Sequence, residues 1–155
     1  MPVFTRPDAE IYYEVHGSGF PLLLFAPGGL RSQLEYWRRS PSNPDAAPPW
    51  MNPMVDLAGR FTVVGMDQRN AGKSRGKVTA ADGWHTYAGD HLALMDHLGH
   101  RRFHVMGGCI GATFCLTLCE LAPNLEIQKD WRGPTHLAES IGKVTDFLTR
   151  NTPKT

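Results

Sequence analysis

The feature that most constrains this chain is a glycine-rich turn between an apolar segment and a helical one, at residues 107–111. The turn reads Gly-Gly-Cys-Ile-Gly, with Cys109 at its centre. The apolar run Phe103–Met106 precedes it, and Ala112–Leu121 follows with a helical pattern. Glycines two positions either side of a central residue allow a sharp strand-to-helix turn, because a side chain there would collide with neighbouring backbone. Cys109 is therefore predicted to project from the end of a sheet.

This arrangement is typical of the Gly-x-nucleophile-x-Gly elbow, which requires a strand before it and a helix after it. The N-terminus of the following helix favours a thiolate at Cys109, and the thiolate is the reactive form of the side chain. One alternative is a small structural cysteine in the turn of another doubly wound fold. A dinucleotide cradle would require Gly-x-Gly-x-x-Gly after the first strand, and that pattern is not present here.

The rest of the chain alternates between strand and helix patterns. Three short apolar runs predict buried strands at Pro21–Ala26, Phe61–Met66 and Phe103–Met106. A helical pattern at Trp84–Leu98 separates the second run from the third, which indicates a parallel sheet. Residues 10–16 alternate in polarity and predict an edge strand, while the five prolines of residues 40–53 predict an irregular loop.

Composition narrows the classes of function. A chain of 155 residues with 41% hydrophobic and 20% charged residues predicts a single domain spanning residues 1–155. A net charge of +1 argues against nucleic acid or a membrane surface as partner, so a small-molecule substrate is expected. The absence of a leader pattern or a long apolar segment predicts a cytoplasmic protein. Three cysteines without a Cys-x-x-Cys pair predict neither a disulfide framework nor a metal site.

Two further motifs follow the other apolar runs. Pro27-Gly28-Gly29 ends the first, leaving backbone N–H groups open to face a developing oxyanion. Asp67-Gln-Arg-Asn-Ala-Gly-Lys-Ser74 ends the second. The three motifs in this order, covering residues 10–123, resemble the α/β-hydrolase superfamily. The resemblance implies a three-layer α/β fold with a mostly parallel sheet.

The resemblance also implies roles for individual residues. Cys109 would be the nucleophile, in place of the more common serine, and the N–H groups of Gly29 and Ile110 would form the oxyanion hole. Asp67 and Arg69 match positions that brace the loops around the site, with a surface salt-bridged turn as the alternative. The implied activity is hydrolysis of an activated ester, lactone or thioester, with no cofactor.

The chain departs from the family after the elbow helix, where the lid and late strands of the usual fold are missing. An internal deletion, an alternative gene model or a naturally minimised hydrolase would each produce this pattern. Residues 10–123 are expected to form the N-terminal half of the fold, and residues 124–155 a final strand, loop and helix. The strand is expected at Leu125–Lys129, parallel to the elbow strand, and the helix at Leu137–Leu148, covering one sheet face.

The short C-terminal part also supplies the candidates for base and acid. His136 lies on the expected loop and is either the catalytic base or an exposed loop residue. Asp130 is the only local substitute for the family's acid. Solvated or core-capping roles fit the remaining histidines, which are His16, His85, His91, His97, His100 and His104. Cys115 and Cys119, one helical turn apart, are expected to fill the core.

A second hypothesis is a catalytically inactive or truncated binding protein that keeps the pocket of the fold without its machinery. Loss of two strands would leave one sheet edge open and apolar surface uncovered. Such an edge favours a homo-oligomer.

Overall fold

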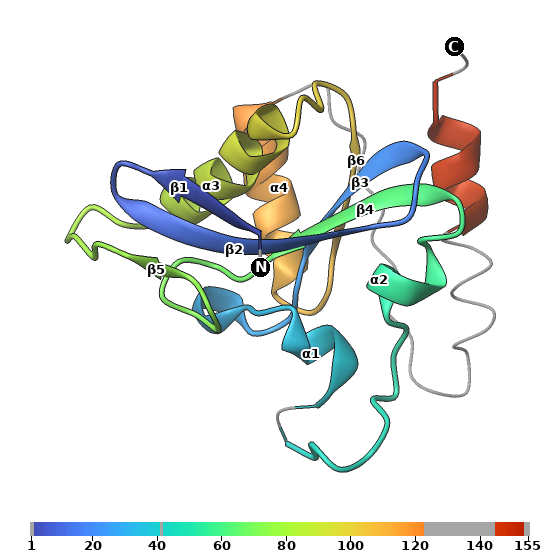
Figure 1. Ribbon diagram of the computed structural model, residues 1–155, viewed down its shortest axis with the longest axis horizontal. Helices are drawn as coiled ribbons and strands as arrows, with labels where there is room; N and C mark the ends of the chain where they lie inside the picture. Colours follow the sequence, from blue (N-terminus) through green and yellow to red (C-terminus); the bar gives the residue numbers. More distant parts are fainter. Residues whose placement is uncertain (1, 41, 123–144, 154–155) are drawn as a thin grey trace.

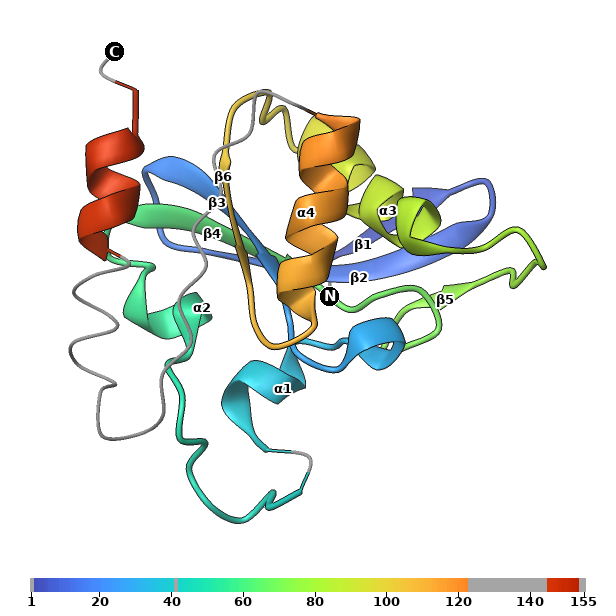
Figure 2. The ribbon, with the colours of Figure 1, turned by 180° about the vertical axis from the view of Figure 1, so that it is seen from behind.

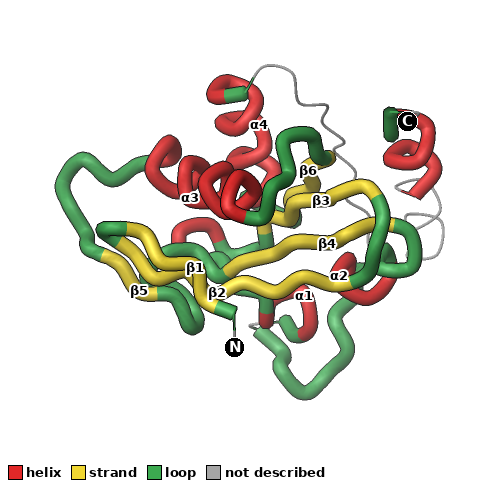
Figure 3. The backbone as a smooth tube through the Cα atoms, turned by 45° about the horizontal axis from the view of Figure 1, so that its top comes forward, coloured by secondary structure: helices red, strands yellow, loops and turns green. Residues whose placement is uncertain are grey.

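The computed structural model describes residues 2–40, 42–122 and 145–153 of this chain. These residues form a six-stranded sheet (Figure 1). The strands are β1 (Val3–Arg6), β2 (Ala9–His16), β3 (Phe20–Phe25), β4 (Phe61–Met66), β5 (Arg75–Gly76) and β6 (His104–Gly107). Their order is β1-β2-β4-β3-β6, with the short β5 paired to β2, and Figure 3 shows β1, β2, β4 and β3 in succession.

The sheet is mixed: β4, β3 and β6 are parallel, whereas β2 pairs antiparallel with its neighbours. β3 lies between β4 and β6 and runs parallel to both. Leu22 to Phe25 of β3 are fully buried, because helices cover both faces of this strand. Phe25 pairs with Gly107, so β3 and β6 end at the same level. The predicted elbow strand therefore lies directly beside the strand that carries the Pro-Gly-Gly motif.

The N-terminal strands differ from the sequence prediction in one respect. Residues 10–16 do form a strand, but β2 is internal and not an edge strand, since it pairs antiparallel with β1 on one side and with β4 on the other. β1 has only four residues, all partly or fully exposed, so no apolar run announces it. The sequence pattern therefore does not predict this hairpin partner of β2.

Helices cover both faces of the sheet, which confirms the predicted three-layer α/β fold (Figures 1 and 2). α3 (Trp84–His97) and α4 (Gly111–Leu121) pack on one face, where Leu94, Phe114 and Leu118 join the core. The short α1 (Glu35–Arg38) and α2 (Pro53–Asp56) lie on the other face. Residues 145–151 are also helical, and Leu148 is buried in the core of that second face.

Most element boundaries agree with the sequence to within one residue. The elbow helix begins at Gly111, the helix before it spans Trp84–His97, and the proline-rich segment is largely irregular between α1 and α2. The predicted strand at Leu125–Lys129 and most of the predicted helix at Leu137–Leu148 lie outside the described residues.

Candidate active site at the carboxyl end of the sheet

Cys109 has the backbone conformation that an elbow requires. Its φ angle is +56°, in the left-handed region that non-glycine residues rarely adopt. The residue is exposed and stands between the end of β6 and the start of α4. Figure 2 shows β6 turning back into α4 at the end of the molecule where the loop after β3 also lies. The thiol is thus presented at the carboxyl edge of the parallel strands, where parallel sheets collect ligands.

The glycines on either side leave no room for a side chain. A Cβ atom on Gly107 would lie 2.3 Å from the carbonyl carbon of Gly111. On Gly111 it would lie 2.5 Å from the carbonyl oxygen of Phe25. Both distances are far below van der Waals contact, and both partners are backbone atoms of packed elements. Close packing of strand against helix therefore explains both ends of the motif.

Side chains from the other face support the middle of the turn. The ring of Trp37, from α1, is fully buried, and a Cβ atom on Gly108 would lie 2.5 Å from its Cη2 atom. The Gly108 N–H also donates to the carbonyl oxygen of Phe25 at 2.9 Å. The backbone just before Cys109 is thus held by β3 and by α1, and sequence patterns alone had not pointed to Trp37.

The two residues expected to form the oxyanion hole are neighbours in space. Gly29 is buried with φ +61°, and its missing Cβ would lie 3.2 Å from Cγ2 of Ile110. Ile110 directly follows Cys109 and caps α4. Among the hydrogen bonds between described residues, none uses the backbone N–H of Gly29 or of Ile110. Both N–H groups thus remain available as donors near the turn that carries Cys109.

The Pro-Gly-Gly turn, the Asp67 segment and the elbow all lie within a region that matches a known protein family. The profile of the α/β hydrolase fold matches residues 21–125, which is more than half of the chain and runs from the second residue of β3 past the end of α4. This chain belongs to the α/β-hydrolase fold family.

Curated relatives of this α/β-hydrolase include two RutD proteins, which their names propose as carbamate hydrolases. RutD of Azorhizobium caulinodans is 30% identical over 136 residues, covering 84% of this chain and 45% of its own length. RutD of Agrobacterium fabrum is 27% identical over 119 residues, covering 74% of this chain and 40% of its own length. The chain thus spans less than half the length of either relative.

Solved structures give the same picture. A proposed epoxide hydrolase from Pseudomonas aeruginosa matches with a TM-score of 0.60 and 30% identity, over 79% of this chain and 37% of that one. A mutant epoxide hydrolase from Vigna radiata matches with a TM-score of 0.64 over 80% of this chain and 35% of that one. The second is only 19% identical and supports the fold alone.

In this α/β-hydrolase, Asp67 and Arg69 brace loops, as the resemblance implied. Asp67 is buried and accepts hydrogen bonds from the N–H groups of Leu34 and Lys73, each at 2.8 Å. Burial raises the pKa of this carboxyl, and the two N–H donors act against the rise. The carboxylate ties the loop after β3 to the loop after β4. Asp67 therefore acts through the two loops that it holds together.

Arg69 lies in a buried ion-pair network, so the alternative of a surface salt-bridged turn is wrong. Its Nε and Nη2 atoms donate to the two carboxylate oxygens of Asp90 at 2.7 and 2.8 Å. Asp90 belongs to α3 and is fully buried, and Arg6 from β1 donates to it at 2.6 Å. Asp8 completes the network at 3.0 Å from Nη1 of Arg69. This network joins the β1–β2 hairpin, the loop after β4 and α3.

The other cysteines are less suited to chemistry than Cys109. Cys115 is buried against the sheet in the α3/α4 core, as predicted, and burial raises the pKa of its thiol to about 12. Burial also raises the pKa of Cys119. A raised pKa lowers the fraction of thiolate at neutral pH. Of the three thiols, the exposed Cys109 is the one placed at the open end of the sheet.

Two of the six histidines within the described residues are buried. His91 is completely buried, stacks on Phe25 with ring centroids 3.8 Å apart, and contacts the Tyr87 carbonyl oxygen through Nδ1 at 3.0 Å. Its burial lowers its pKa to about 4. His104 starts β6 and contacts Thr152 Oγ1 at 3.0 Å. In the described part of the chain, no histidine hydrogen-bonds Cys109.

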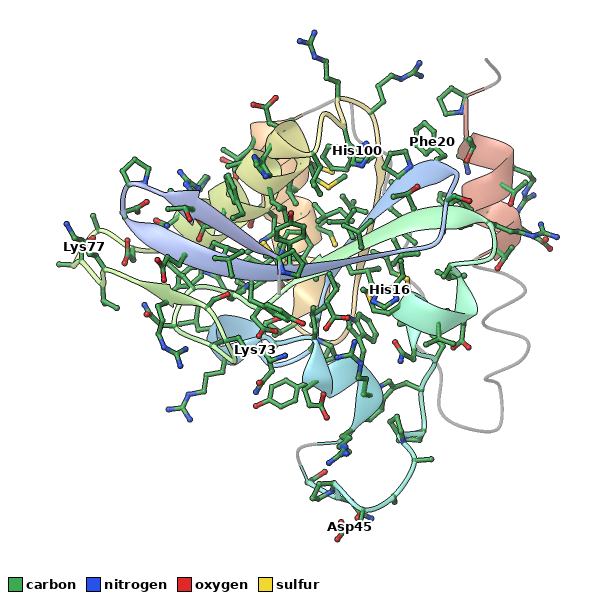
Figure 4. All side chains as sticks on the ribbon, viewed as in Figure 1. His16, Phe20, Asp45, Lys73, Lys77 and His100 are labelled. Atoms are coloured by element: carbon green, nitrogen blue, oxygen red, sulfur yellow. The ribbon has the colours of Figure 1, made fainter. Side chains whose placement is uncertain are left out.

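A cavity of about 670 Å³ lies at the opposite end of the sheet, away from Cys109. Residues from the start of β3, the loop before β6 and the C-terminal helix line it, including Phe20, His100 and Asn151. Figure 4 places His100 and Phe20 together at the top of the molecule, whereas Lys73 lies toward the end that carries the elbow. This cavity is therefore not part of the candidate active site.

The remaining predicted site residues, His136 and Asp130, lie outside the described residues. Within the described ranges, no cluster of three or more His, Cys, Asp or Glu side chains has metal-binding geometry. The helices described between residues 2 and 153 also include none with the length and apolar character to cross a membrane.

Proposed function

We propose that this α/β-hydrolase acts on activated acyl compounds, namely esters, thioesters or lactones, with Cys109 as nucleophile. The observation that carries the proposal is the conformation of Cys109, an exposed thiol in left-handed backbone between two glycines that admit no side chain. A structural cysteine would not need this strained position, and strain of this kind concentrates at functional sites. The proposal is made for the 155-residue chain, which is shorter than its relatives.

The reaction would take place in two steps. The thiolate of Cys109 attacks the carbonyl carbon, a C–S bond forms, and the negative oxygen is held by the N–H groups of Gly29 and Ile110. The leaving group then departs with the electrons of its bond to the carbonyl carbon and takes up a proton. Water attacks the thioester in the same manner, which releases the carboxylic acid and restores the thiol. A thiolate is itself a good leaving group, so activated substrates suit it better than amides.

His136 is proposed to accept and return the proton, with Asp130 as a weak substitute for the usual acid. Since a thiol is partly ionised without help, Cys109 would keep some activity without an oriented base, whereas a serine would keep far less. We also propose a cytoplasmic location, because reduced thiols such as that of Cys109 persist in that compartment.

Relatives support attack on a carbonyl carbon. The names of the RutD proteins propose carbamates as substrates, and a carbamate carries a carbonyl carbon open to the same attack. The Pseudomonas aeruginosa structure is named for epoxides, so the family relationship by itself leaves the substrate open. The nucleophile and its two N–H neighbours favour the acyl reading.

The test is hydrolysis of p-nitrophenyl acetate by the wild type, by Cys109→Ala and by Cys119→Ala as a matched control on α4. Wild type and control should turn over the ester and Cys109→Ala should lose at least about 90% of the rate, in keeping with removal of a nucleophile. Mass spectrometry of quenched wild-type enzyme should find the acetyl group on the peptide with Cys109. A folded wild type without turnover would support the binding protein instead.

A further inference from the structure

We infer that Ser32 is a positioning residue that holds the Gly29 N–H against the elbow, an inference that rests on the proposed function. Ser32 directly follows the short 3-10 helix Gly29–Arg31 in the loop after β3 and is almost completely buried, with 1% of its surface exposed. A polar side chain buried to this extent costs free energy unless it is hydrogen-bonded. Its bonds therefore show what it contributes.

Three hydrogen bonds fasten Ser32, and each holds a different part of the site. The hydroxyl group donates to the carbonyl oxygen of Ala26 at 2.6 Å, which joins the end of the loop to its beginning. The backbone N–H of Ser32 donates to the carbonyl oxygen of Gly29 at 3.1 Å. The carbonyl oxygen of Ser32 accepts from the N–H of Gln68 at 3.0 Å, which fixes the loop to the end of β4.

The segment after β3 contains one 3-10 turn, Gly29–Arg31, but the two glycines at its start restrict the backbone little. Gly28 and Gly29 have φ angles of +113° and +61°. Glycine reaches such conformations without a steric penalty, but it also leaves them easily. The Ser32 hydroxyl closes the loop over Ala26, so the peptide units between them, including the N–H of Gly29, keep one orientation.

Orientation of this N–H is what an oxyanion hole depends on. Gly29 lies against Ile110, whose N–H is the second proposed donor, so a rotation of the Gly29 peptide would separate the pair. Removal of one oxyanion donor typically costs about 10²- to 10³-fold in kcat. Loosening a donor should cost less, roughly tenfold in kcat.

The matched control is Thr62, whose hydroxyl group donates to the Gly19 carbonyl oxygen at 2.9 Å. This bond also joins a side chain to loop backbone, but it lies at the start of β4, at the opposite end of the sheet. Thr62→Val removes the bond with little change of shape. Its kcat should stay at the wild-type value.

The experiment compares Ser32→Ala, Ser32→Thr and Thr62→Val in hydrolysis of p-nitrophenyl acetate. Ser32→Ala should lower kcat about tenfold at nearly constant KM, because the donor acts mainly in the transition state. Ser32→Thr keeps the hydroxyl group and should recover most of the kcat. If Ser32→Ala does not fold, Ser32→Cys fills the same space with a weak donor and should show the same loss.

Amide hydrogen exchange provides a second readout that does not depend on turnover. In the Ser32→Ala variant, the amides of Arg31 and Gln68, which donate to the carbonyl oxygens of Gly28 and Ser32, should exchange at least roughly tenfold faster while β4 keeps its protection. Cys109-dependent turnover with unchanged kcat in Ser32→Ala would overturn the inference and leave the proposed function intact. Absence of turnover in the wild type would instead refute the proposed function, and unchanged exchange of the Arg31 and Gln68 amides in Ser32→Ala would separately overturn the positioning role of Ser32.

Discussion

The reactivity of single residues in this hydrolase follows from where the fold places them. Cys109, Cys115 and Cys119 all lie within one stretch of eleven residues. Cys109 is exposed at the turn before α4, whereas Cys115 is packed into the core. Burial in apolar surroundings disfavours the thiolate, so depth in the core determines which sulfur can act as a nucleophile.

We predict that Cys109 is the first thiol to be alkylated. Limiting iodoacetamide at pH 7.5 should label it at least about tenfold faster than Cys115, whose pKa is raised to about 12 by burial. Peptide mapping by mass spectrometry at successive times measures the order. Earlier labelling of Cys115 or Cys119 would show that the elbow does not present its thiol.

Replacing the candidate base, His136, is expected to lower the rate of hydrolysis more than replacing the candidate acid, Asp130. His136→Ala should lower the rate of ester hydrolysis several-fold, since general-base help is lost but the thiol still ionises in part. Asp130→Asn should change the rate by less than about twofold, because one short loop with Gly133 and Pro134 must place both side chains. Loss of activity in Asp130→Asn at unchanged melting temperature would indicate a complete triad.

At the scale of elements, the elbow is a junction of β3, β6 and α4 at which backbone touches backbone. The N–H of Gly108 donates to Phe25 of β3, and the N–H of Gly111 donates to the Gly108 carbonyl oxygen at 2.9 Å. The glycines at the two ends of the motif permit this approach. The geometry of the candidate site therefore depends on the packing of strand on helix.

Gly107→Ala and Gly111→Ala should each destabilise the fold by about 2 kcal/mol or more, as overpacking against rigid backbone does. The control is Gly89→Ala in α3, where a Cβ atom would meet nothing within 4 Å. This change should stabilise the protein by up to about 1 kcal/mol, because alanine favours helix. Urea unfolding gives the three values, and equal stability of all three variants would exclude the close packing described for the elbow.

At the scale of the whole molecule, the core contains a histidine that must stay neutral. The pKa of His91 is lowered to about 4 in the folded protein, against an ordinary value of 6.5. Below about pH 6.5 the unfolded chain takes up a proton that the folded chain does not, so stability falls as pH drops from about 6.5 to about 4. The loss from this group amounts to up to about 3 kcal/mol.

His91→Gln should flatten the dependence of the unfolding free energy on pH between 4 and 6.5. Leu118→Val, a neutral change in the same core, should lower stability by a nearly constant amount at every pH in this range. Urea titrations at four pH values test both variants. A wild-type slope retained in His91→Gln would rule out His91 as the source.

Among the described residues, β6 is an edge strand of the sheet. Within the described residues, β6 pairs with β3 and has no strand on its other side, and Leu116 on the adjoining α4 is 61% exposed. Exposed edges and apolar surface favour self-association. We therefore predict a homo-oligomer, measured by light scattering at micromolar concentration, that Leu116→Glu converts to monomer. A monodisperse wild-type monomer would contradict this.

Local sequence determined much of this protein. The apolar runs, the helix patterns and the three motif turns predicted β3, β4, β6, α3 and α4 within a residue or so, because burial on both faces and strained turns restrict which residues are allowed. The same motifs predicted the family and the position of Cys109. Local patterns can predict these features because the type of each helix, strand or turn depends mainly on residues close together in the sequence.

Only the tertiary structure decided which distant residues meet. It placed β2 inside the sheet, turned Arg69 inward onto Asp90, set Trp37 beneath Gly108 and closed Ser32 over Ala26. No sequence pattern predicts these contacts. The residues next to a buried serine or tryptophan in the sequence are the same whether or not its side chain supports a site. Their partners are separated in the chain and are brought together by packing across the sheet, which depends on the whole fold at once.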